Sequence, residues 1–190
     1  MNELNMCQGL NMRLKPNQPI ISDVPAQKVI RVDIQGNPNT QTIKLMPPLY
    51  TMAYAIRKIY KEQNRPFKVE KLRGRWSQMN LDQPKDIWQG MYALPIPNEV
   101  IQLPEIKKGK LIEGVKLHLE LWHYGKTAQI LHIGPYTTEH QTTQTLLHFI
   151  QQQGYQIEEN SHEEIYLSDP NKTRSEDLKT LILYRLKPIK

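Results

Sequence analysis

The sequence of 190 residues lacks long apolar runs, has one cysteine and contains few aromatic residues, which make up 7% of the chain. No stretch of about 18 apolar residues occurs, so we expect no transmembrane helix. Residues 1–11 also lack the apolar segment of a signal peptide. Because Cys7 is the single cysteine, no internal disulfide can form. Together these absences predict a cytoplasmic protein.

Motifs for metal, phosphate and nucleophilic chemistry are missing too. The six histidines show no metal-ligand spacing, and one cysteine does not make a zinc site. The sequence has neither a glycine-rich phosphate loop nor a Gly-x-Ser-x-Gly elbow. We therefore predict no metal ion and no cofactor.

Positive charge is concentrated in the first half of the sequence, although the net charge of the whole chain is only +6. Residues 1–100 contain 14 Lys or Arg against 8 Asp or Glu, whereas residues 101–190 contain 11 of each. Much of the excess lies in residues 57–75. Such a run usually forms a solvated surface, and an acidic protein partner is the alternative. No helix-turn-helix, zinc-finger or RNA-binding motif accompanies it, which argues against nucleic acid.

Hydrophobic periodicity predicts two long helices among strands. The helical spacing of Leu49, Met52 and Ile56 predicts a helix that opens at Pro47 and Pro48 and runs to about Glu62. A second helix is expected over residues 136–153, capped by Thr137 or Thr138 and ended by Gly154. A capping box at Thr173 predicts a short third helix. Strands are expected over residues 28–35, 67–76, 86–96, 115–122, 126–133, 164–167 and 181–186.

The order of these elements predicts an α+β fold with internal repetition. The sequence strand, long helix, strand, strand occurs twice, in a first half (23–97) and a second half (115–190) joined by residues 98–114. Residues 1–22 are expected to form an N-terminal arm. Two pseudo-symmetric units of this kind form an antiparallel sheet with two long helices and a central pocket, within a single domain over residues 23–190.

Two stretches of the second half carry a family resemblance: His132-Ile133-Gly134-Pro135-Tyr136 and Glu164-Ile165-Tyr166-Leu167-Ser168-Asp169-Pro170. Together with residues 36–39, residues 72–76, Trp88 and Gly154-Tyr155, their order and spacing resemble the GyrI-like small-molecule-binding domain family from about Pro19 to Pro188. The resemblance implies a stand-alone form of the effector-binding fold of multidrug-responsive regulators. Proteins of this branch resemble drug-binding proteins or hydrolases that open cyclopropane-bearing natural products.

The sequence departs from the pattern of this family at three places. Arg73 stands where the family has an acid, and His123-Tyr124 stands where acidic residues are frequent. The His-His-Glu run of the family reads His162-Glu163-Glu164. The resemblance therefore implies a site that retains one carboxylate at Glu164, gains Glu163 and loses the acid of the first half.

Glu164 is the candidate anchor of a ligand. Side chains alternate along a strand, so Glu164 and Tyr166 share one face, and they point into the pocket if Ile165 and Leu167 pack under the second helix. A carboxylate among aromatic rings can act as a general acid or base, or hold a cation. From the residues alone an exposed glutamate is the commoner case, and the resemblance favours a role. The predicted ligand-binding residues are Glu164, Tyr166, Tyr136, Trp76, Trp88, Arg73 and Glu163.

Arg73 separates the possible functions. Arg73 is either an exposed member of the basic run or the partner of Glu163 or Glu164. Pairing would rule out a mechanism that uses two carboxylates. It would also allow the pocket to bind a ligand that carries a carboxyl group. We predict a binding protein for drug-like aromatic or amphipathic ligands of positive charge rather than an enzyme. One alternative is a hydrolase of strained electrophiles in which Glu164 activates water. The other is an interaction module that acts on DNA gyrase, as GyrI-like inhibitors do, through residues 57–75.

Overall fold

The computed structural model describes residues 9–11, 14–77, 83–106 and 114–189, and Cys7 lies outside them. Contacts along the chain divide it into two compact units, which are considered one at a time. The units do not coincide with the two sequential halves, because each contains segments from both. The first unit holds Ala26–Leu72 and Met79–His123; the second holds Gln8–Pro25, Arg73–Gln78 and Tyr124–Lys190.

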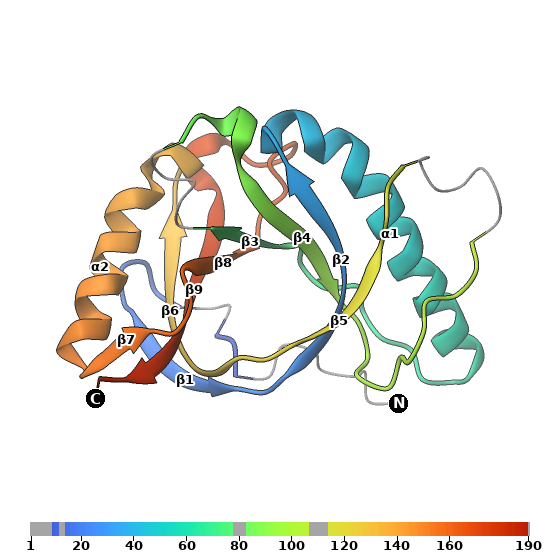
Figure 1. The fold of residues 1–190 in the computed structure, drawn as a ribbon, viewed down its shortest axis with the longest axis horizontal. Coiled ribbons are helices and arrows are strands. Elements are labelled where there is room, and N and C mark those ends of the chain that lie inside the picture. The colour runs from blue at the N-terminus through green and yellow to red at the C-terminus, as the bar shows by residue number, and fades with distance from the viewer. Residues whose placement is uncertain (1–8, 12–13, 78–82, 107–113, 190) are drawn as a thin grey trace. The chain divides into compact units, whose positions relative to one another are not determined.

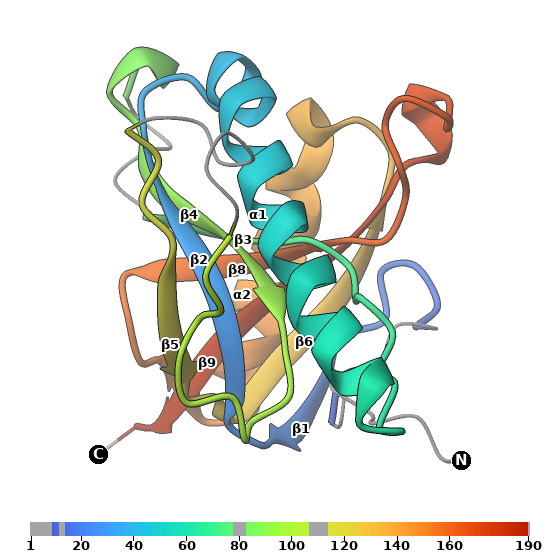
Figure 2. The ribbon, with the colours of Figure 1, turned by 90° about the vertical axis from the view of Figure 1, so that its right-hand side faces the viewer.

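In the first unit a long helix packs on antiparallel strands. Strand β2 (Gln27–Gln35) pairs with β4 (Gln89–Pro95) on one side and with β5 (His118–Trp122) on the other. Helix α1 (Pro38–Glu62) lies across β2 and β4 (Figure 2). Its buried residues recur at helical spacing and form one apolar face: Leu45, Pro48, Leu49, Met52, Ala53, Ile56 and Tyr60.

Helix α1 begins earlier than the sequence predicted. Asn37 is its N-cap and accepts a hydrogen bond from the backbone N–H of Asn39 at 3.1 Å, and Pro38 follows in the first turn. The prediction that Pro47 and Pro48 open the helix is wrong, because both lie inside it. Proline inside a helix costs about 3 kcal/mol. Burial of the apolar face of α1, which includes Pro48, offsets that cost.

In the second unit the described strands pair in the order β1-β6-β9-β8-β3, and β7 also pairs with β9. Every pairing is antiparallel. Helix α2 (Glu139–Gln152) packs on β6 and β7 (Figure 1). The strands are β1 (Ile20–Val24), β3 (Arg73–Ser77), β6 (Gly125–Ile133), β7 (Tyr155–Ile157), β8 (Ser161–Tyr166) and β9 (Lys179–Pro188).

The two faces of this sheet bury different apolar clusters. On one face Leu146 and Ile150 of α2 pack with side chains that include Ile182. On the other face Ile165 packs with a cluster from β6, β9 and the N-terminal segment: Leu14, Leu131, Leu181 and Leu183. Ile165 therefore lies on the face away from α2, and the idea that it packs under the second helix is wrong.

The predicted α+β architecture with antiparallel strands and two long helices is confirmed. In chain order two strands, a helix and two further strands occur twice, with β7 inserted in the second copy. Within the described residues no helix is long and apolar enough to cross a membrane.

Several predicted boundaries differ from the structure. Of residues 67–76 only the end is a strand, β3, and the strand expected over residues 86–96 is divided into a 3-10 turn (Lys85–Ile87) and β4. The region expected as an arm, residues 1–22, contains the start of β1. The segment after Thr173 forms only a 3-10 turn, Ser175–Asp177, with no side-chain cap. A 3-10 turn, Tyr136–Thr138, precedes α2, and Thr138 donates to the carbonyl of Pro135 instead of capping the helix.

Candidate ligand-binding site

Strands β3 and β8 of the second unit carry the charged residues singled out in the sequence. Their antiparallel register pairs Arg75 with Glu163 and Gly74 with Glu164. Paired residues of an antiparallel ladder share a face, and successive side chains alternate between faces. The odd-numbered side chains of both strands therefore lie on one face, and the even-numbered ones lie on the other.

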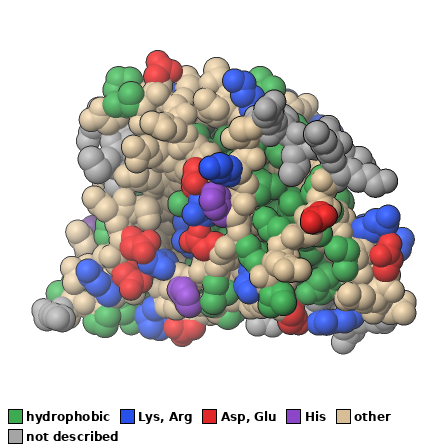
Figure 3. Space-filling model, turned by 45° about the vertical axis from the view of Figure 1, so that its right-hand side comes forward, with side chains coloured by type: hydrophobic (Ala, Val, Ile, Leu, Met, Phe, Trp, Pro, Cys, Tyr) green, Lys and Arg blue, Asp and Glu red, His purple; other side chains and the backbone are tan. Residues whose placement is uncertain are grey.

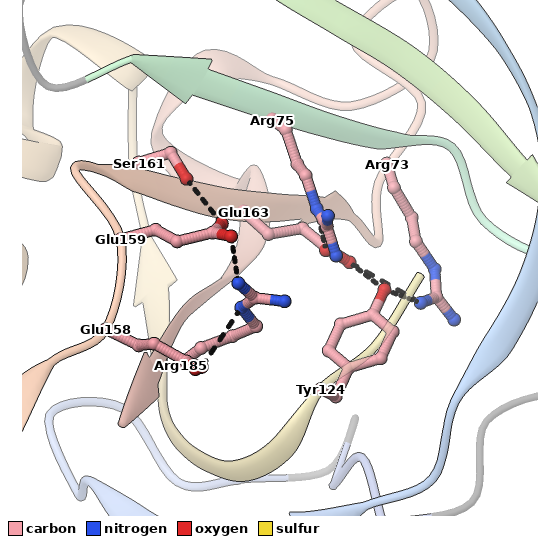
Figure 4. A network of polar contacts seen from close by, with 8 residues as sticks. All are labelled: Arg73, Arg75, Tyr124, Glu158, Glu159, Ser161, Glu163 and Arg185. Carbon is pink, nitrogen blue, oxygen red and sulfur yellow. Dashed lines mark hydrogen bonds and ion pairs between the residues drawn. The ribbon is translucent and has the colours of Figure 1, made fainter. Parts of the chain in front are cut away.

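On the odd-numbered face Glu163 is the centre of a contact network (Figure 4). The Tyr124 hydroxyl donates to Glu163 Oε1 at 2.8 Å, and Arg73 Nη1 lies 3.4 Å from the same oxygen. Arg75 Nε donates to Glu163 Oε2 at 3.0 Å. Arg73 Nη1 also donates to the Tyr124 hydroxyl at 2.5 Å, and both guanidinium groups lie within 6 Å of the Tyr124 ring centre, at 5.7 and 5.3 Å. Glu163 is thus contacted by two cations and a phenol.

Burial makes this network energetically important. Arg73 is 1% exposed and Glu163 is 4% exposed. A buried carboxylate without a partner costs several kcal/mol, whereas cationic partners and hydrogen bonds compensate for that cost. Burial raises the pKa of Tyr124 well above its ordinary value, with smaller opposing effects from Arg73. The phenol therefore keeps its proton and can donate to Glu163.

A shallow pocket adjoins the network. Its free space is about 290 Å³, including volume open to solvent. Arg185, on its lining, forms ion pairs with Glu158 at 3.6 Å and with Glu159. The pocket is therefore polar, with charges of both signs and one aliphatic side chain. Its lining residues are Arg75, Tyr124, Thr127, Glu159, Ser161, His162, Glu163, Leu183 and Arg185.

Glu164 lies on the opposite face, which is the face that α2 covers. Its partner in β9 is Ile182, a member of the cluster packed against α2. Glu164 is 9% exposed, and its Oε1 lies 2.9 Å from Nε2 of His162. In the described part of the chain no group of three or more His, Cys, Asp or Glu residues is arranged to hold a metal ion.

The aromatic residues expected around Glu164 gather on this same face. Trp76 Nε1 donates to the Tyr166 hydroxyl at 3.1 Å. The rings of Tyr136 and Tyr166 meet edge to face, with their centres 5.8 Å apart. Gly74 makes room for them, because a Cβ atom there would lie 2.7 Å from the Tyr166 hydroxyl oxygen.

A second carboxyl group, Glu139 in the first turn of α2, interacts with Glu164. The pKa of Glu139 is raised to about 9, first by burial and second by the negative charge of Glu164, while a hydrogen bond with Thr180 opposes the rise. Glu139 therefore keeps its proton near neutral pH. Sequence analysis missed Glu139, and only its place one helical turn after Tyr136 could have indicated it.

The His132–Tyr136 stretch fixes the start of α2. The two ring nitrogens of His132 contact the Thr142 hydroxyl at 2.9 Å and the Pro135 carbonyl at 3.2 Å. Gly134 has a positive φ of 136°, a conformation that glycine adopts without strain. This part of the resemblance therefore has a structural role that places Glu139 and its turn against the sheet.

The structure separates the predicted site residues into three groups. Arg73 pairs with Glu163, which was one of the two pairings considered for it. Glu164, Tyr166, Tyr136 and Trp76 lie together on the other face. Trp88 belongs to the first unit, where its indole N–H donates to the Gln83 carbonyl at 2.9 Å.

Of the nine residues that line the pocket only Glu163 was predicted, and the residues that were missed include Tyr124, Arg75 and Arg185. Arg75 could have been found from strand alternation, because it shares a face with Arg73. Tyr124 was noted only as a departure from the family pattern. No local signal marked Arg185, which comes to the pocket from β9.

The three departures from the GyrI-like pattern meet in this one network. Arg73, Tyr124 and Glu163 come from distant parts of the sequence and are in mutual contact. Arg73, which stands where the resemblance led us to expect an acid, is bound by the acid Glu163.

The basic run over residues 57–75 does not behave as one exposed surface. Arg73 is buried in the second unit, Arg57 Nε donates to the Phe67 carbonyl at 3.0 Å, and Arg65 pairs with Glu99 at 2.8 Å. On the face drawn in Figure 3, acidic and basic side chains lie mixed with one another. The contacts of these described residues give no specific support to an acidic partner.

Comparison with known proteins agrees with the fold. A family model described as GyrI-like small molecule binding domain matches residues 120–187. A hydrolase from Listeria innocua has 24% identity and a TM-score of 0.76, covering 90% of this chain and 93% of its own. A conserved protein from the same organism has 26% identity and a TM-score of 0.75, with the same coverage. The EcmrR C-terminal domain has 14% identity and a TM-score of 0.58, covering 90% of this chain and 98% of its own. No curated protein matches the sequence.

Residues 120–187 match the model of a GyrI-like small molecule binding domain, and the fold of the chain is shared with the C-terminal domain of EcmrR. The family resemblance expected from the sequence is confirmed.

Proposed function

We propose that the second unit binds a small aromatic or amphipathic organic molecule in the pocket beside Glu163. The family match supports binding of a small molecule. The observation that carries the location is the buried contact of Glu163 with Arg73, Arg75 and Tyr124 at the edge of a pocket. Small-molecule sites combine hydrophobic or aromatic walls with a few polar groups held in fixed positions.

The network provides that fixed geometry. Arg73 and Tyr124 are almost completely buried, and both contact the same oxygen of Glu163. Arg75 and Tyr124 also line the pocket, so the network extends to where a ligand would lie. Polar groups held rigid before binding lose little entropy when the ligand arrives, which favours affinity and specificity.

The carboxylate of this proposal is Glu163, whereas the sequence favoured Glu164. Glu164 is in contact with His162 and interacts with Glu139 on the other face of the sheet. A cationic ligand, as the sequence led us to expect, would have to replace Arg75 at Glu163, because both guanidinium groups already contact this carboxylate.

Fluorescence titration with anionic, neutral and cationic aromatic dyes tests the location. Ser161→Trp places a large side chain in the lining and is expected to weaken binding of every dye by about tenfold or more, since the pocket is small. Ser175→Trp, in the exposed turn of the same unit, is the matched control and should bind like wild type. The proposal fails if no dye binds wild type, or if Ser161→Trp binds as wild type does.

A hydrolase is the second candidate, and the Glu139–Glu164 pair is the observation that favours it. A carboxyl group that keeps its proton near neutral pH can act as an acid beside a second carboxyl group that acts as the base. In this proposal the oxygen of water bonds to a carbon of a strained ring as the ring bond breaks. Glu164 takes the proton of water, and protonated Glu139 gives its proton to the atom that leaves with the electron pair. The Listeria innocua relative called a hydrolase has the same fold.

Mass spectrometry after incubation with a cyclopropane-bearing electrophile decides this second candidate. Addition of water by wild type, lost in Glu164→Gln and Glu139→Gln but kept in Glu163→Gln, is the expected pattern. If the wild-type protein leaves the substrate unchanged, the hydrolase proposal is wrong. If only Glu163→Gln loses the activity, the reaction takes place on the Glu163 face of the sheet.

A further inference from the structure

We infer that the ligand carries a carboxylate or a similar planar anionic group, which binds Arg75 and Arg185 in the pocket. This inference rests on the proposed function and names the chemical class of its ligand. It reverses the ligand charge expected from the sequence.

The first argument is that Glu163, the buried carboxylate of the pocket, is already occupied. Glu163 Oε1 is contacted by Tyr124 and Arg73, and Oε2 accepts from Arg75. A ligand ammonium could reach this carboxylate only by breaking a buried ion pair. Breaking such a pair leaves one charge buried without compensation, which is strongly unfavourable.

The second argument concerns the two arginines of the lining. Arg75 and Arg185 have side chains that are 15% and 18% exposed, so both are mostly buried but reach the pocket. A guanidinium group presents a planar fork of N–H donors that fits a carboxylate by two parallel hydrogen bonds. Two such groups on one small pocket provide the geometry for an anionic ligand.

The third argument is that the acidic partners of Arg185 are far more exposed to solvent than the acidic partner of Arg75. Glu158 and Glu159, which contact Arg185, have side chains that are 47% and 50% exposed, whereas the side chain of Glu163 is 5% exposed. Half-exposed ion pairs contribute little because water and salt screen them. Arg185 can therefore exchange Glu159 for a ligand carboxylate at small cost, while Arg75 stays fixed by Glu163. Glu158 and Glu159 are thus more exposed than either guanidinium group.

Apolar contact is available for the rest of such a ligand. Leu183 and the Tyr124 ring both belong to the lining. Arginine and tyrosine are also the side chains whose planar groups stack well on aromatic rings. The ligand class that fits is a flat aromatic acid, with its ring on these side chains and its carboxylate on the arginines.

Isothermal titration calorimetry with three matched naphthalene compounds tests this inference. Naphthalene-2-carboxylate, 2-naphthamide and 2-naphthylmethylamine share one ring system and differ in charge. We expect the carboxylate to bind at least about tenfold more tightly than the amide, and the amine to bind most weakly. Arg75→Gln and Arg185→Gln should weaken binding of the carboxylate much more than binding of the amide, so that the preference for the carboxylate is lost.

Controls separate charge recognition from folding. Arg174→Gln removes an arginine of the same unit that is bound to Asp177 in an exposed turn, and should leave all three affinities unchanged. Circular dichroism checks that each variant is folded. If Arg75→Gln does not fold, Arg75→Lys, which keeps the charge but loses the planar fork, should reduce the preference partially and carries the test with Arg185→Gln.

The outcomes distinguish this inference from the proposed function. Equal binding of all three compounds contradicts the inference and leaves small-molecule binding intact. Tightest binding of the amine, or a carboxylate preference that survives both glutamine variants, also overturns it. If none of the three compounds and none of the dyes binds, the proposed function itself is wrong.

Discussion

Glu163 and Glu164 are neighbours on β8, yet their carboxyl groups lie in opposite electrostatic surroundings. Glu163 contacts two guanidinium groups and a phenol on the face away from α2. Glu164, on the α2 face, contacts His162 and interacts with a second carboxyl, Glu139. Cations favour an ionised carboxylate, whereas a neighbouring carboxylate favours the protonated form. One step along a strand therefore separates a carboxyl group that contacts cations from one that lies beside a protonated carboxyl, Glu139.

The comparison explains what Arg73 does at the position where the resemblance led us to expect an acid. Arg73 lies on the Glu163 face, where Tyr124 and Glu163 complete its contacts. The Glu164 face keeps its carboxylate and gains a second acid from α2 rather than from β3. The ion pairs of Glu163 and the carboxyl pair of Glu164 and Glu139 thus lie on opposite faces of the sheet.

The largest expected change in stability comes from a substitution on the Glu163 face. Arg73→Met leaves the buried Glu163 with fewer cationic contacts and should lower the free energy of unfolding by about 3 to 5 kcal/mol. Urea denaturation followed by circular dichroism measures it. The double variant Arg73→Met with Glu163→Leu removes both charges and should recover part of the loss. A loss below about 1 kcal/mol for Arg73→Met would contradict a stabilising role for this pair.

On the opposite face, Gly74→Ala tests the close approach of Tyr166. A Cβ atom would lie 2.7 Å from the Tyr166 hydroxyl oxygen and 2.8 Å from Trp76 Nε1, so both side chains must move. We expect a loss of about 1 to 3 kcal/mol in the free energy of unfolding, as for overpacked sites. In a Tyr166→Phe background the alanine should cost less, because the closest atom is gone. An equal cost in both backgrounds would show that the hydroxyl is not the obstacle.

The raised pKa of Glu139 on the Glu164 face predicts a pH dependence. The pKa of Glu139 is raised to about 9 in the folded protein, so the folded state binds more protons than the unfolded state between about pH 5 and that value. The stabilisation is therefore complete at low pH and is lost as the pH rises, by at most about 1.4 kcal/mol per pH unit. Glu139→Gln should flatten the slope and be more stable than wild type by on the order of 1 to 2 kcal/mol near about pH 8.

The same denaturation series supplies the control for the pH effect. Glu159→Gln removes a half-exposed carboxylate of the second unit and should keep the wild-type slope. A Glu139→Gln slope equal to that of wild type would mean that Glu139 does not carry the proton.

The smallest effect is expected from a single hydrogen bond on this face. Tyr166→Phe removes the acceptor of the Trp76 indole N–H and should cost about 1 kcal/mol in the free energy of unfolding. The fluorescence maximum of tryptophan and the urea midpoint both report on it. An unchanged midpoint would indicate that water replaces the lost bond.

Local patterns predicted much of the architecture. Gly154, with a positive φ of 76°, follows the end of α2 as expected. Alternation correctly placed Glu164 and Tyr166 on one face of β8. The start of α1 was missed because Asn37 and Pro38 form an earlier cap than the more conspicuous Pro47 and Pro48.

The candidate site was harder to predict, because alternation does not say which face of a strand a helix covers. That choice depends on the register of β8 with β9, which pairs Glu164 with Ile182 under α2. The contacts of Glu163 with Arg73 and Tyr124 join residues 90 and 39 positions apart in the sequence. No periodicity within one element contains that information.

Binding of naphthalene-2-carboxylate to Glu163→Gln and Glu164→Gln tests most directly whether the ligand site lies on the Glu163 face. Glu163→Gln removes the protein carboxylate that competes for Arg75, so the account predicts tighter binding, by about threefold or more, with Glu164→Gln equal to wild type. Unchanged binding in Glu163→Gln together with loss of binding in Glu164→Gln would contradict it and place the ligand on the α2 face.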